Sequence, residues 1–302
     1  MTRTIPLTGL VGSHPLAALA SFGLLRLVSA DDPQARLSFV LQDEWIARLH
    51  SERFANAEEL VAWLADWVNS DALKGWFDWA EDVRIPPPAF REKLETAIAG
   101  GALEYAAWLG SLAAYGAVDK QKGLVKPSLF YMVSGQQSFL AGLRDIVGHV
   151  RANPAALFTE ALVGPWRYQT RTHSLGWDSN TERLHALRSR APTSEKPSCV
   201  AAAVLLAAMA LPLHPTAAEG GRNRTTGFVY DGDNYYHWPV FTAPLQLDEL
   251  RSLLQTAAWQ VRGRWRRGIA AVYRSRRSEF GQGYAVFRAA QLEKEAGATA
   301  GR

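Results

Sequence analysis

The stretch CVAAAVLLAAMALPL, residues 199–213, is the longest apolar run in the chain, and the prediction of the fold starts from it. Its 15 residues are fewer than the roughly 20 that a membrane-spanning helix needs. The run is rich in alanine, the best helix former, and it ends at Leu-Pro-Leu-His-Pro. We therefore predict a helix that is buried in a protein core.

The N-terminal part of the chain combines a helical pattern with a strand pattern. Pro15 opens an apolar segment, 16–28, with small or apolar residues at helical spacing. Proline suits the first turn of a helix because its missing N–H would be unpaired there. Asp31-Asp32-Pro33 ends this segment. Residues 36–41 and 45–49 have the composition of short strands and predict a hairpin.

The rest of the chain contains further helical and strand patterns. Periodicity, capping residues and proline starts predict helices at 57–68, 90–99, 103–112, 135–150, 154–163 and 247–258. β-branched and aromatic residues between turn signals predict short strands at 125–131, 228–230, 237–241, 268–273 and 283–289. The sequence thus predicts an α+β fold that is mainly helical, with short antiparallel strands and hairpins near the N-terminus and in the C-terminal third.

The domain organisation follows from length and charge. The 302 residues contain no repeat and no clear linker, so we predict a single globular domain over 1–302. An alternative subdivision separates a helical, acidic-to-neutral part, 1–165, from a basic α+β part, 166–302. Residues 1–100 carry a net charge of −5 and residues 101–302 a net charge of +9. Any polyanion is therefore expected to meet the second part of the chain.

The sequence contains no residue pattern that is typical of a catalytic site. The single cysteine, Cys199, excludes an intrachain disulfide and a multi-cysteine metal site. The histidines form no metal or triad motif, although His173 and His185 share a polar loop, 166–193. Asp231 and Asp233 are more typical of a turn than of a magnesium site. We expect no enzyme activity, no cofactor and no metal.

Two basic segments are candidates for nucleic-acid contact, because arginines pair with phosphates while aromatic rings offer stacking surfaces. The first comprises Arg262, Arg264, Trp265, Arg266, Arg267, Arg274, Arg276 and Arg277. The second comprises Arg167, Arg171, Arg183 and Arg188 in the polar loop. Each segment is also compatible with a solvated face or with an acidic partner protein. The N-terminus lacks the pattern of a secretory signal, which predicts a cytoplasmic protein without membrane contact.

Three segments carry a family resemblance. The opening, LTGLVGSHPL at 7–16 followed by FGLLR at 22–26, is similar to the start of several subunits of type I-G (formerly I-U) CRISPR systems. His14 stands where the usual pattern has asparagine. The other two segments are FYMVSGQQSFL at 130–140 and SLGWD at 174–178. In this order they resemble the helicase-nuclease-extension family or its large-subunit-like relatives.

The resemblance implies a non-catalytic subunit of a type I-G CRISPR–Cas interference system. Its expected partners are guide RNA or target DNA, other CRISPR-associated effector subunits and the helicase-nuclease. In such systems base pairing reads the sequence, whereas the proteins hold the backbone and recruit the nuclease. The alternative is a protein–protein adaptor without direct nucleic-acid contact. Six tryptophans within the first 110 residues would then supply an apolar patch for the partner.

Overall fold

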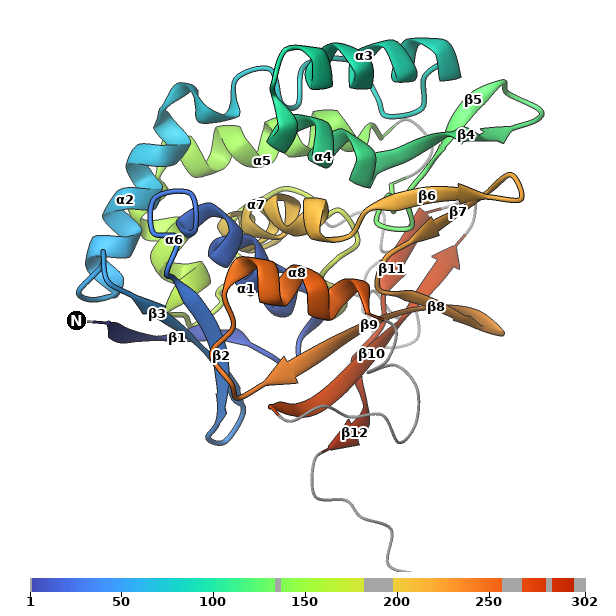
Figure 1. The fold of residues 1–302 in the computed structure, drawn as a ribbon. Coiled ribbons are helices and arrows are strands. Elements are labelled where there is room, and N and C mark those ends of the chain that lie inside the picture. Colours follow the sequence, from blue (N-terminus) through green and yellow to red (C-terminus); the bar gives the residue numbers. More distant parts are fainter. Residues whose placement is uncertain (1, 134–136, 182–197, 257–267, 281–283, 296–302) are drawn as a thin grey trace, which may run out of the picture.

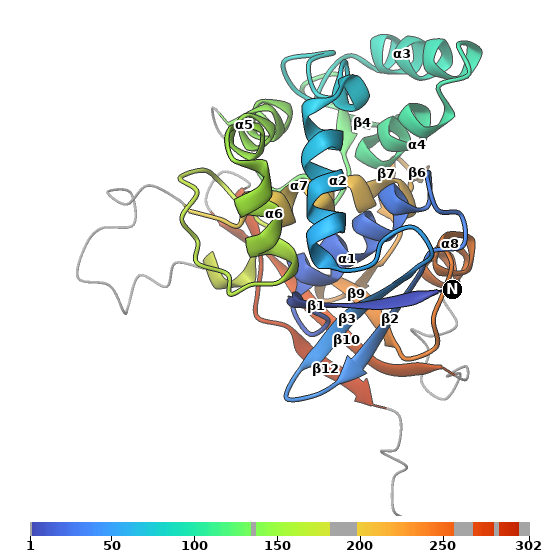
Figure 2. The ribbon, with the colours of Figure 1, turned by 90° about the vertical axis from the view of Figure 1, so that its left-hand side faces the viewer.

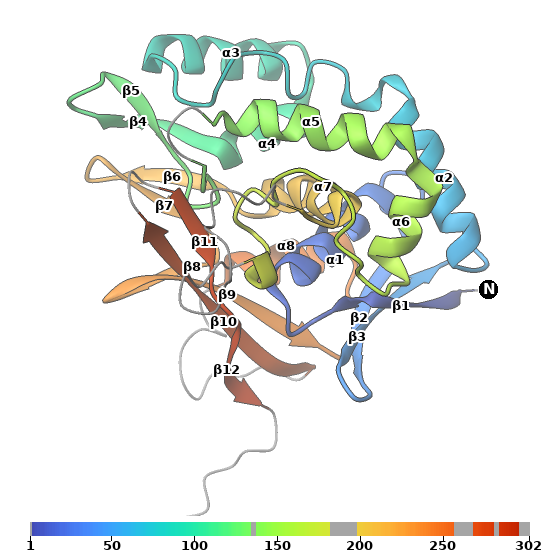
Figure 3. The same cartoon turned by 180° about the vertical axis from the view of Figure 1, so that it is seen from behind.

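The computed structural model describes residues 2–133, 137–181, 198–256, 268–280 and 284–295. At its centre α7 (Ala201–Ala210) packs along α1 (Pro15–Val28), and all ten residues of α7 are buried. This confirms the buried helix predicted from the apolar run. Figures 1 and 3 show α1 and α7 in the middle of the molecule, between a helical layer and the strands of the two larger sheets.

The other helices surround this central pair. They are α2 (Ala57–Asn69), α3 (Pro87–Ala99), α4 (Leu103–Leu112), α5 (Phe139–Ala152), α6 (Pro154–Leu162) and α8 (Leu247–Gln255). Helices α5 and α6 contact α7 directly, and α2 packs against α6. Figure 2 shows α2 running from the α3 side of the molecule towards the N-terminal sheet. Three-residue 3₁₀ turns lie at Asp71–Leu73, Ser179–Thr181 and Leu211–Leu213.

Two larger antiparallel sheets and two separate hairpins complete the described fold. The N-terminal sheet has the order β1 (Arg3–Val11), β3 (Trp45–Ser51), β2 (Arg36–Leu41). The C-terminal sheet has the order β11 (Tyr284–Phe287), β10 (Ile269–Phe280), β9 (Asp233–Phe241), β8 (Phe228–Asp231), with β12 (Gln291–Glu295) also paired to β10. The hairpins are β4 (Ala113–Asp119) with β5 (Leu124–Pro127), and β6 (Thr216–Glu219) with β7 (Arg222–Thr225).

The prediction of a mainly helical fold is wrong. Of the described residues, 39% are helical and 29% lie in strands, and these strands are spread along the chain. Strand β1 was missed because it contains Pro6, but β1 is a sheet edge, where a missing N–H is tolerated. Hairpin β6–β7 was not predicted, because its residues are polar rather than β-branched or aromatic. Its Gly220-Gly221 turn, with both φ angles positive, is nevertheless a hairpin signal.

The predicted strands 228–230 and 237–241 form a hairpin, although its second strand begins earlier than predicted, at Asp233. Strands β8 and β9 pair from Phe228 opposite Tyr236 to Asp231 opposite Asp233. The turn between them centres on Gly232, whose φ of 72° lies in the left-handed region that glycine adopts without strain. The acidic turn residues are thereby held at the tip, next to the neighbouring strand β10. Among the described residues, no helix is long and apolar enough to cross a membrane.

A buried aromatic cluster joins α7 to the C-terminal sheet. Phe130 contacts His214, Phe228, Tyr236 and Phe287 in edge-to-face arrangements with ring centroids 5.0 to 6.3 Å apart. His214 is fully buried. Its Nδ1 donates to the Ala210 carbonyl oxygen at 3.3 Å, since a carbonyl can only accept, and its Nε2 accepts from the Tyr236 hydroxyl at 3.2 Å. The geometry therefore holds a neutral imidazole.

His214 is expected to make the protein less stable in acid. Burial lowers the pKa of His214 from 6.5 to about 4. Between these two pH values the unfolded chain binds a proton that the folded protein does not, so the free energy of unfolding falls as the pH drops. The loss approaches about 3 kcal/mol at pH 4. Urea unfolding of wild type and His214→Gln should show a weaker pH dependence for the variant, and parallel curves from pH 7 to 4 would contradict this.

Candidate nucleic-acid interface

The predicted site residues divide into those that the structure describes and those that it does not. Arg274, Arg276 and Arg277 lie on β10, while Arg167 and Arg171 lie in the segment that follows α6. The remaining predicted residues fall outside the described part of the chain: Arg183, Arg188, Arg262, Arg264, Trp265, Arg266 and Arg267.

Arg277 is a buried residue that holds the fold together. Its side chain is 8% exposed and forms an ion pair with Glu279. Its Nε donates to the Leu129 carbonyl oxygen at 2.9 Å, and its Nη2 donates to the Tyr131 carbonyl oxygen at 3.1 Å. The guanidinium therefore connects β10 to the segment after β5, which leaves little of it for a ligand.

Arg274 and Arg276 lie on the face of β10 opposite to Arg277, and both reach the surface. Arg276 Nη2 lies 2.8 Å from Asp233 Oδ2, and Arg274 Nη1 lies 3.7 Å from Asp231 Oδ2. The acids of the β8–β9 turn thus pair with the arginines of the neighbouring strand. On this face the carboxylates nearly balance the guanidinium charges, which weakens its attraction for phosphate.

Aromatic side chains nevertheless stand beside these arginines. Tyr230 is 68% exposed and Phe280 is 42% exposed. Both line a pocket of about 320 Å³ that also includes Arg276 and Arg288. The Arg288 guanidinium lies 5.0 Å from the Phe280 ring centroid. This combination of arginines and exposed rings has the composition of a stacking surface for single-stranded nucleic acid.

The side chains of Arg167 and Arg171 are exposed, whereas the backbone around them is held by hydrogen bonds. Glu160 Oε1 accepts from the backbone N–H groups of Arg167 and Tyr168, at 2.6 and 3.1 Å. Thr170 forms a β-bridge with Cys199 at the start of the central helix. The segment that carries both arginines is therefore anchored to α6 and α7, while their side chains point to solvent.

The two small hairpins form a basic surface that the sequence prediction missed. Lys126 Nζ donates to the Gly221 carbonyl oxygen at 3.2 Å, and Asn223 Nδ2 donates to the Pro127 carbonyl oxygen at 2.8 Å. These bonds join β5 to the β6–β7 hairpin, and Figures 1 and 3 show both hairpins extending on the same side of the molecule. We call these two hairpins, 113–127 and 216–225, the twin hairpins.

The twin hairpins carry an excess of positive charge. Their cations are Lys120, Lys122, Lys126, Arg222 and Arg224, and their carboxylates are Asp119 and Glu219. Arg224 pairs with Glu219. Asp119 accepts from the backbone N–H groups of Gln121 and Lys122, which lowers its pKa, and it shapes the turn. Within the described residues the other four cations form no ion pair; Lys120, Lys122 and Arg222 are exposed, whereas Lys126 is partly buried and donates to Gly221.

The three segments that carry the family resemblance meet in space. His14 Nε2 lies 3.3 Å from Asp178 Oδ1, which joins the opening segment to SLGWD. Trp177 Nε1 donates to the Phe130 carbonyl oxygen at 2.9 Å, which joins SLGWD to the segment 130–140. A Cβ on Gly176 would come within 2.7 Å of Met132 Cβ. The three segments therefore form one packed junction around the start of α1.

The junction does not have the geometry of a catalytic triad. Ser179 Oγ lies 3.2 Å from His14 Nε2, the same nitrogen that faces Asp178. In a triad the nucleophile and the acid contact opposite nitrogens of the imidazole. His14 Nδ1 is buried without a hydrogen-bond partner in the described part of the chain. The histidine therefore cannot relay a proton from Ser179 towards Asp178.

The other candidate reactive groups are also explained by packing. Cys199 is buried, and burial raises the pKa of its thiol, which keeps it protonated. His173 Nε2 is bonded to Gln137 at 3.0 Å, and His185 lies outside the described residues. In the ranges that the structure describes, no three histidine, cysteine or acidic side chains are grouped so as to hold a metal ion.

Comparison with known proteins adds no assignment. No protein-family model matches the sequence, and no curated protein shows significant similarity to it.

Proposed function

We propose that this chain is a non-catalytic subunit of a type I-G CRISPR–Cas interference system and that it contacts the backbone of the guide or target nucleic acid. Its other partners would be the effector subunits and the helicase-nuclease. The family part of this proposal rests on the three sequence segments, and their close packing around His14 and Asp178 supports treating them as one feature. The chemical part rests on the surface.

The observation that supports nucleic-acid contact is the excess positive charge of the twin hairpins. Lys120, Lys122 and Arg222 are exposed on two hairpins joined by hydrogen bonds, and none of them forms an ion pair with a described residue. A cation that has no ion-pair partner can bind a phosphate and release its counterions without first breaking an ion pair. The turn lysines project from loop tips, as expected for contacts to a phosphate backbone rather than to base edges.

Charge reversal on the twin hairpins should weaken nucleic-acid binding. The variant Lys120→Glu, Lys122→Glu, Arg222→Glu is expected to lower the affinity for labelled single-stranded RNA, single-stranded DNA and duplex DNA by about tenfold or more. The slope of log K against log salt concentration should become shallower by roughly 2 to 3, since each lost phosphate contact removes about 0.7 to 0.9. Fluorescence polarisation at several salt concentrations measures both quantities.

The matched control changes the net charge by the same amount elsewhere. The variant Arg3→Glu, Arg36→Glu, Lys74→Glu alters exposed residues of β1, β2 and the turn after α2. It should bind nucleic acid with the salt slope of the wild type. Equal weakening in both variants would show that only overall charge matters. Unchanged binding in the twin-hairpin variant would refute the proposed contact.

A role as protein adaptor is a second candidate, and a pocket lined by tryptophans favours it. Trp63, Trp67 and Trp76 are partly exposed and surround one opening on the acidic N-terminal side of the chain. Large rings in a concave site are typical anchors for a protein partner. The two functions use different surfaces and do not exclude each other.

A further inference from the structure

Three aromatic side chains are exposed in the described part of the chain: Tyr115, Tyr230 and Phe280. Tyr115 lies on β4, within the twin hairpins. Tyr230 and Phe280 both line a pocket of about 320 Å³, which is formed by the β8–β9 turn and the end of β10. Figures 1 and 3 show the β8–β9 turn on the same side of the molecule as the twin hairpins. The exposed rings and the exposed cations therefore share one side of the protein.

The register of β8 and β9 places an amide beside the Tyr230 ring. Tyr230 lies directly opposite Asn234 in this antiparallel pair, so the two side chains are neighbours on the same face of the sheet. Both line the pocket, and neither side chain forms a hydrogen bond with another described residue. The tyrosine offers a face for stacking, and the amide next to it offers a donor and an acceptor.

Two ion pairs in the pocket decide which kind of ligand it suits. Arg276 Nη2 lies 2.8 Å from Asp233 Oδ2, and Arg277 forms an ion pair with Glu279. All four residues line the pocket. A phosphate group or a charged peptide side chain would have to compete with these internal pairs for its partner. A neutral planar ring needs only an exposed ring face and hydrogen-bonding groups, and the pocket provides both.

Arg288 holds the second ring of the pocket in place. Its Nε donates to Ser278 Oγ at 3.0 Å, and its guanidinium carbon lies 5.0 Å from the centroid of the Phe280 ring. A guanidinium group at this distance attracts the ring through the cation–π interaction. Phe280 is nevertheless 42% exposed, so part of its ring can still contact a ligand.

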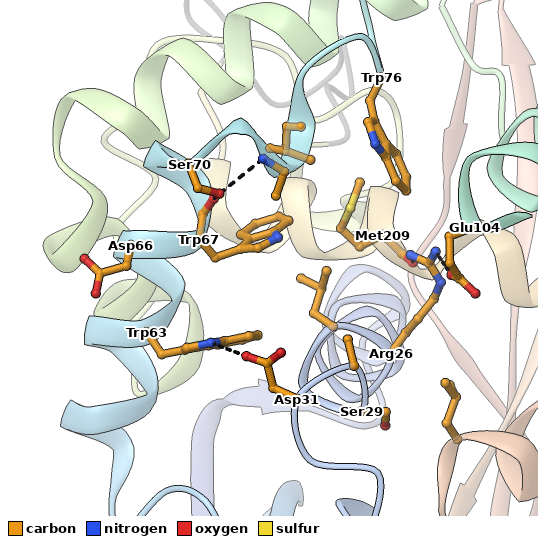
Figure 4. Close-up of a pocket in the computed structure, with 15 residues that line it drawn as sticks. Arg26, Ser29, Asp31, Trp63, Asp66, Trp67, Ser70, Trp76, Glu104 and Met209 are labelled. Atoms are coloured by element: carbon orange, nitrogen blue, oxygen red, sulfur yellow. Dashed lines mark hydrogen bonds and ion pairs between the residues drawn. The ribbon is translucent and has the colours of Figure 1, made fainter. Parts of the chain in front are cut away.

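The larger pocket, lined by tryptophans, offers no comparable stacking surface (Figure 4). Its rings are only partly exposed. Trp63 Nε1 donates to Asp31 Oδ2 at 3.0 Å, and the Arg53 guanidinium lies 5.9 Å from the centroid of the Trp63 ring. The chain's own side chains thus occupy that ring, whereas no cation of the described residues lies over the Tyr230 ring.

We propose that the pocket beside Tyr230 binds one unpaired nucleobase of a single-stranded RNA or DNA. The base stacks on the Tyr230 ring, and the Asn234 amide forms hydrogen bonds with its edge. The volume lies at the lower end of the range for small-ligand sites, about 300 to 1,000 Å³, which suits a single base. A base inside a duplex is stacked and paired, so it cannot enter. The inference rests on the proposed function and narrows it, since the strand that the twin hairpins contact is single-stranded where it passes this pocket.

The test compares single strands with a duplex. Wild type and Tyr230→Ala are titrated by fluorescence polarisation with a labelled single-stranded RNA of mixed sequence, the DNA strand of the same sequence and the corresponding DNA duplex. Tyr230→Ala should weaken the binding of both single strands by about fivefold or more, the usual effect of losing one base–aromatic stack, and should leave duplex binding unchanged. The salt slope should stay that of the wild type, because no phosphate contact is lost. Tyr230→Phe keeps the ring and should bind like the wild type.

Controls separate this inference from the proposed function. Leu41→Ala removes an exposed apolar side chain of β2 and should bind like the wild type. Thermal melting establishes that each variant is folded, and if Tyr230→Ala is not, Phe280→Ala decides the question by the same comparison. Unchanged affinity for the single strands, or an equal loss for single strands and duplex, would overturn the inference and leave the hairpin contact standing. A selective loss in Tyr230→Ala with normal binding by the twin-hairpin variant would support the pocket and refute the hairpin contact.

Discussion

Gly23→Ala is expected to lower the free energy of unfolding by about 3 kcal/mol, the upper end of the usual cost of overpacking a core. At Gly23 the backbones of α1 and α7 touch. A Cβ built there would lie 1.8 Å from the Leu206 carbonyl oxygen and 2.9 Å from the Ala210 nitrogen. Because both obstacles are backbone atoms of a helix, no side-chain rotation can relieve the clash. The two central helices would have to separate by roughly 1 Å, which would disturb contacts of α7 on every side.

A second helical glycine provides the control. Gly110 lies in α4, and a Cβ built there would meet no atom within 4 Å. Gly110→Ala should therefore stabilise the protein by about 0.5 to 1 kcal/mol, the ordinary advantage of alanine over glycine in a helix. Urea unfolding monitored by tryptophan fluorescence measures both variants. A loss of less than about 1 kcal/mol for Gly23→Ala would mean that α1 and α7 are not in close contact.

Arg277→Ala is expected to cost about 2 to 4 kcal/mol of stability, because it leaves two buried carbonyl groups without a donor. Those carbonyls belong to Leu129 and Tyr131, about 150 residues earlier in the chain. Its neighbour Arg276 is the matched control. The Arg276 side chain is 51% exposed and pairs with Asp233 at the surface, so Arg276→Ala should change stability by less than about 0.5 kcal/mol.

The same pair of variants separates structural from ligand-binding roles on β10. Folded Arg277→Ala protein, held well below its melting temperature, should bind nucleic acid as the wild type does, because the side chain is buried. Denaturation curves and polarisation titrations on both proteins provide the measurements. A large loss of stability for Arg276→Ala with none for Arg277→Ala would reverse the assignment of the two side chains.

The sequence alone could divide the arginines of β10 into two groups, one for each face of the strand. Successive side chains of a strand face opposite sides of a sheet, so Arg274 and Arg276 share one face and Arg277 takes the other. That alternation indicates two classes of arginine but does not tell which class is buried. The answer depends on what packs against each face, here the carbonyls of the segment after β5.

The twin hairpins show where local signals were available and where they were not. Gly220-Gly221 between short polar runs is a turn signal from which β6–β7 could have been predicted but was not. Strand β4 was not predicted, although the predicted helix 103–112 ends directly before its first residue, Ala113. Their side-by-side position could not be predicted, since it depends on hydrogen bonds between residues 95 or more positions apart.

Local sequence patterns were enough to predict the buried central helix, the β8–β9 turn and the division into an acidic first part and a basic remainder. These features depend on composition and on neighbours within a few positions, where hydrophobicity and backbone preference act directly. The folded chain was needed to show which arginine is buried, which lysines are exposed side by side and which tryptophans line a pocket. Each of these depends on partners that are distant in the chain, and burial and charge pairing are properties of the assembled core rather than of any local segment.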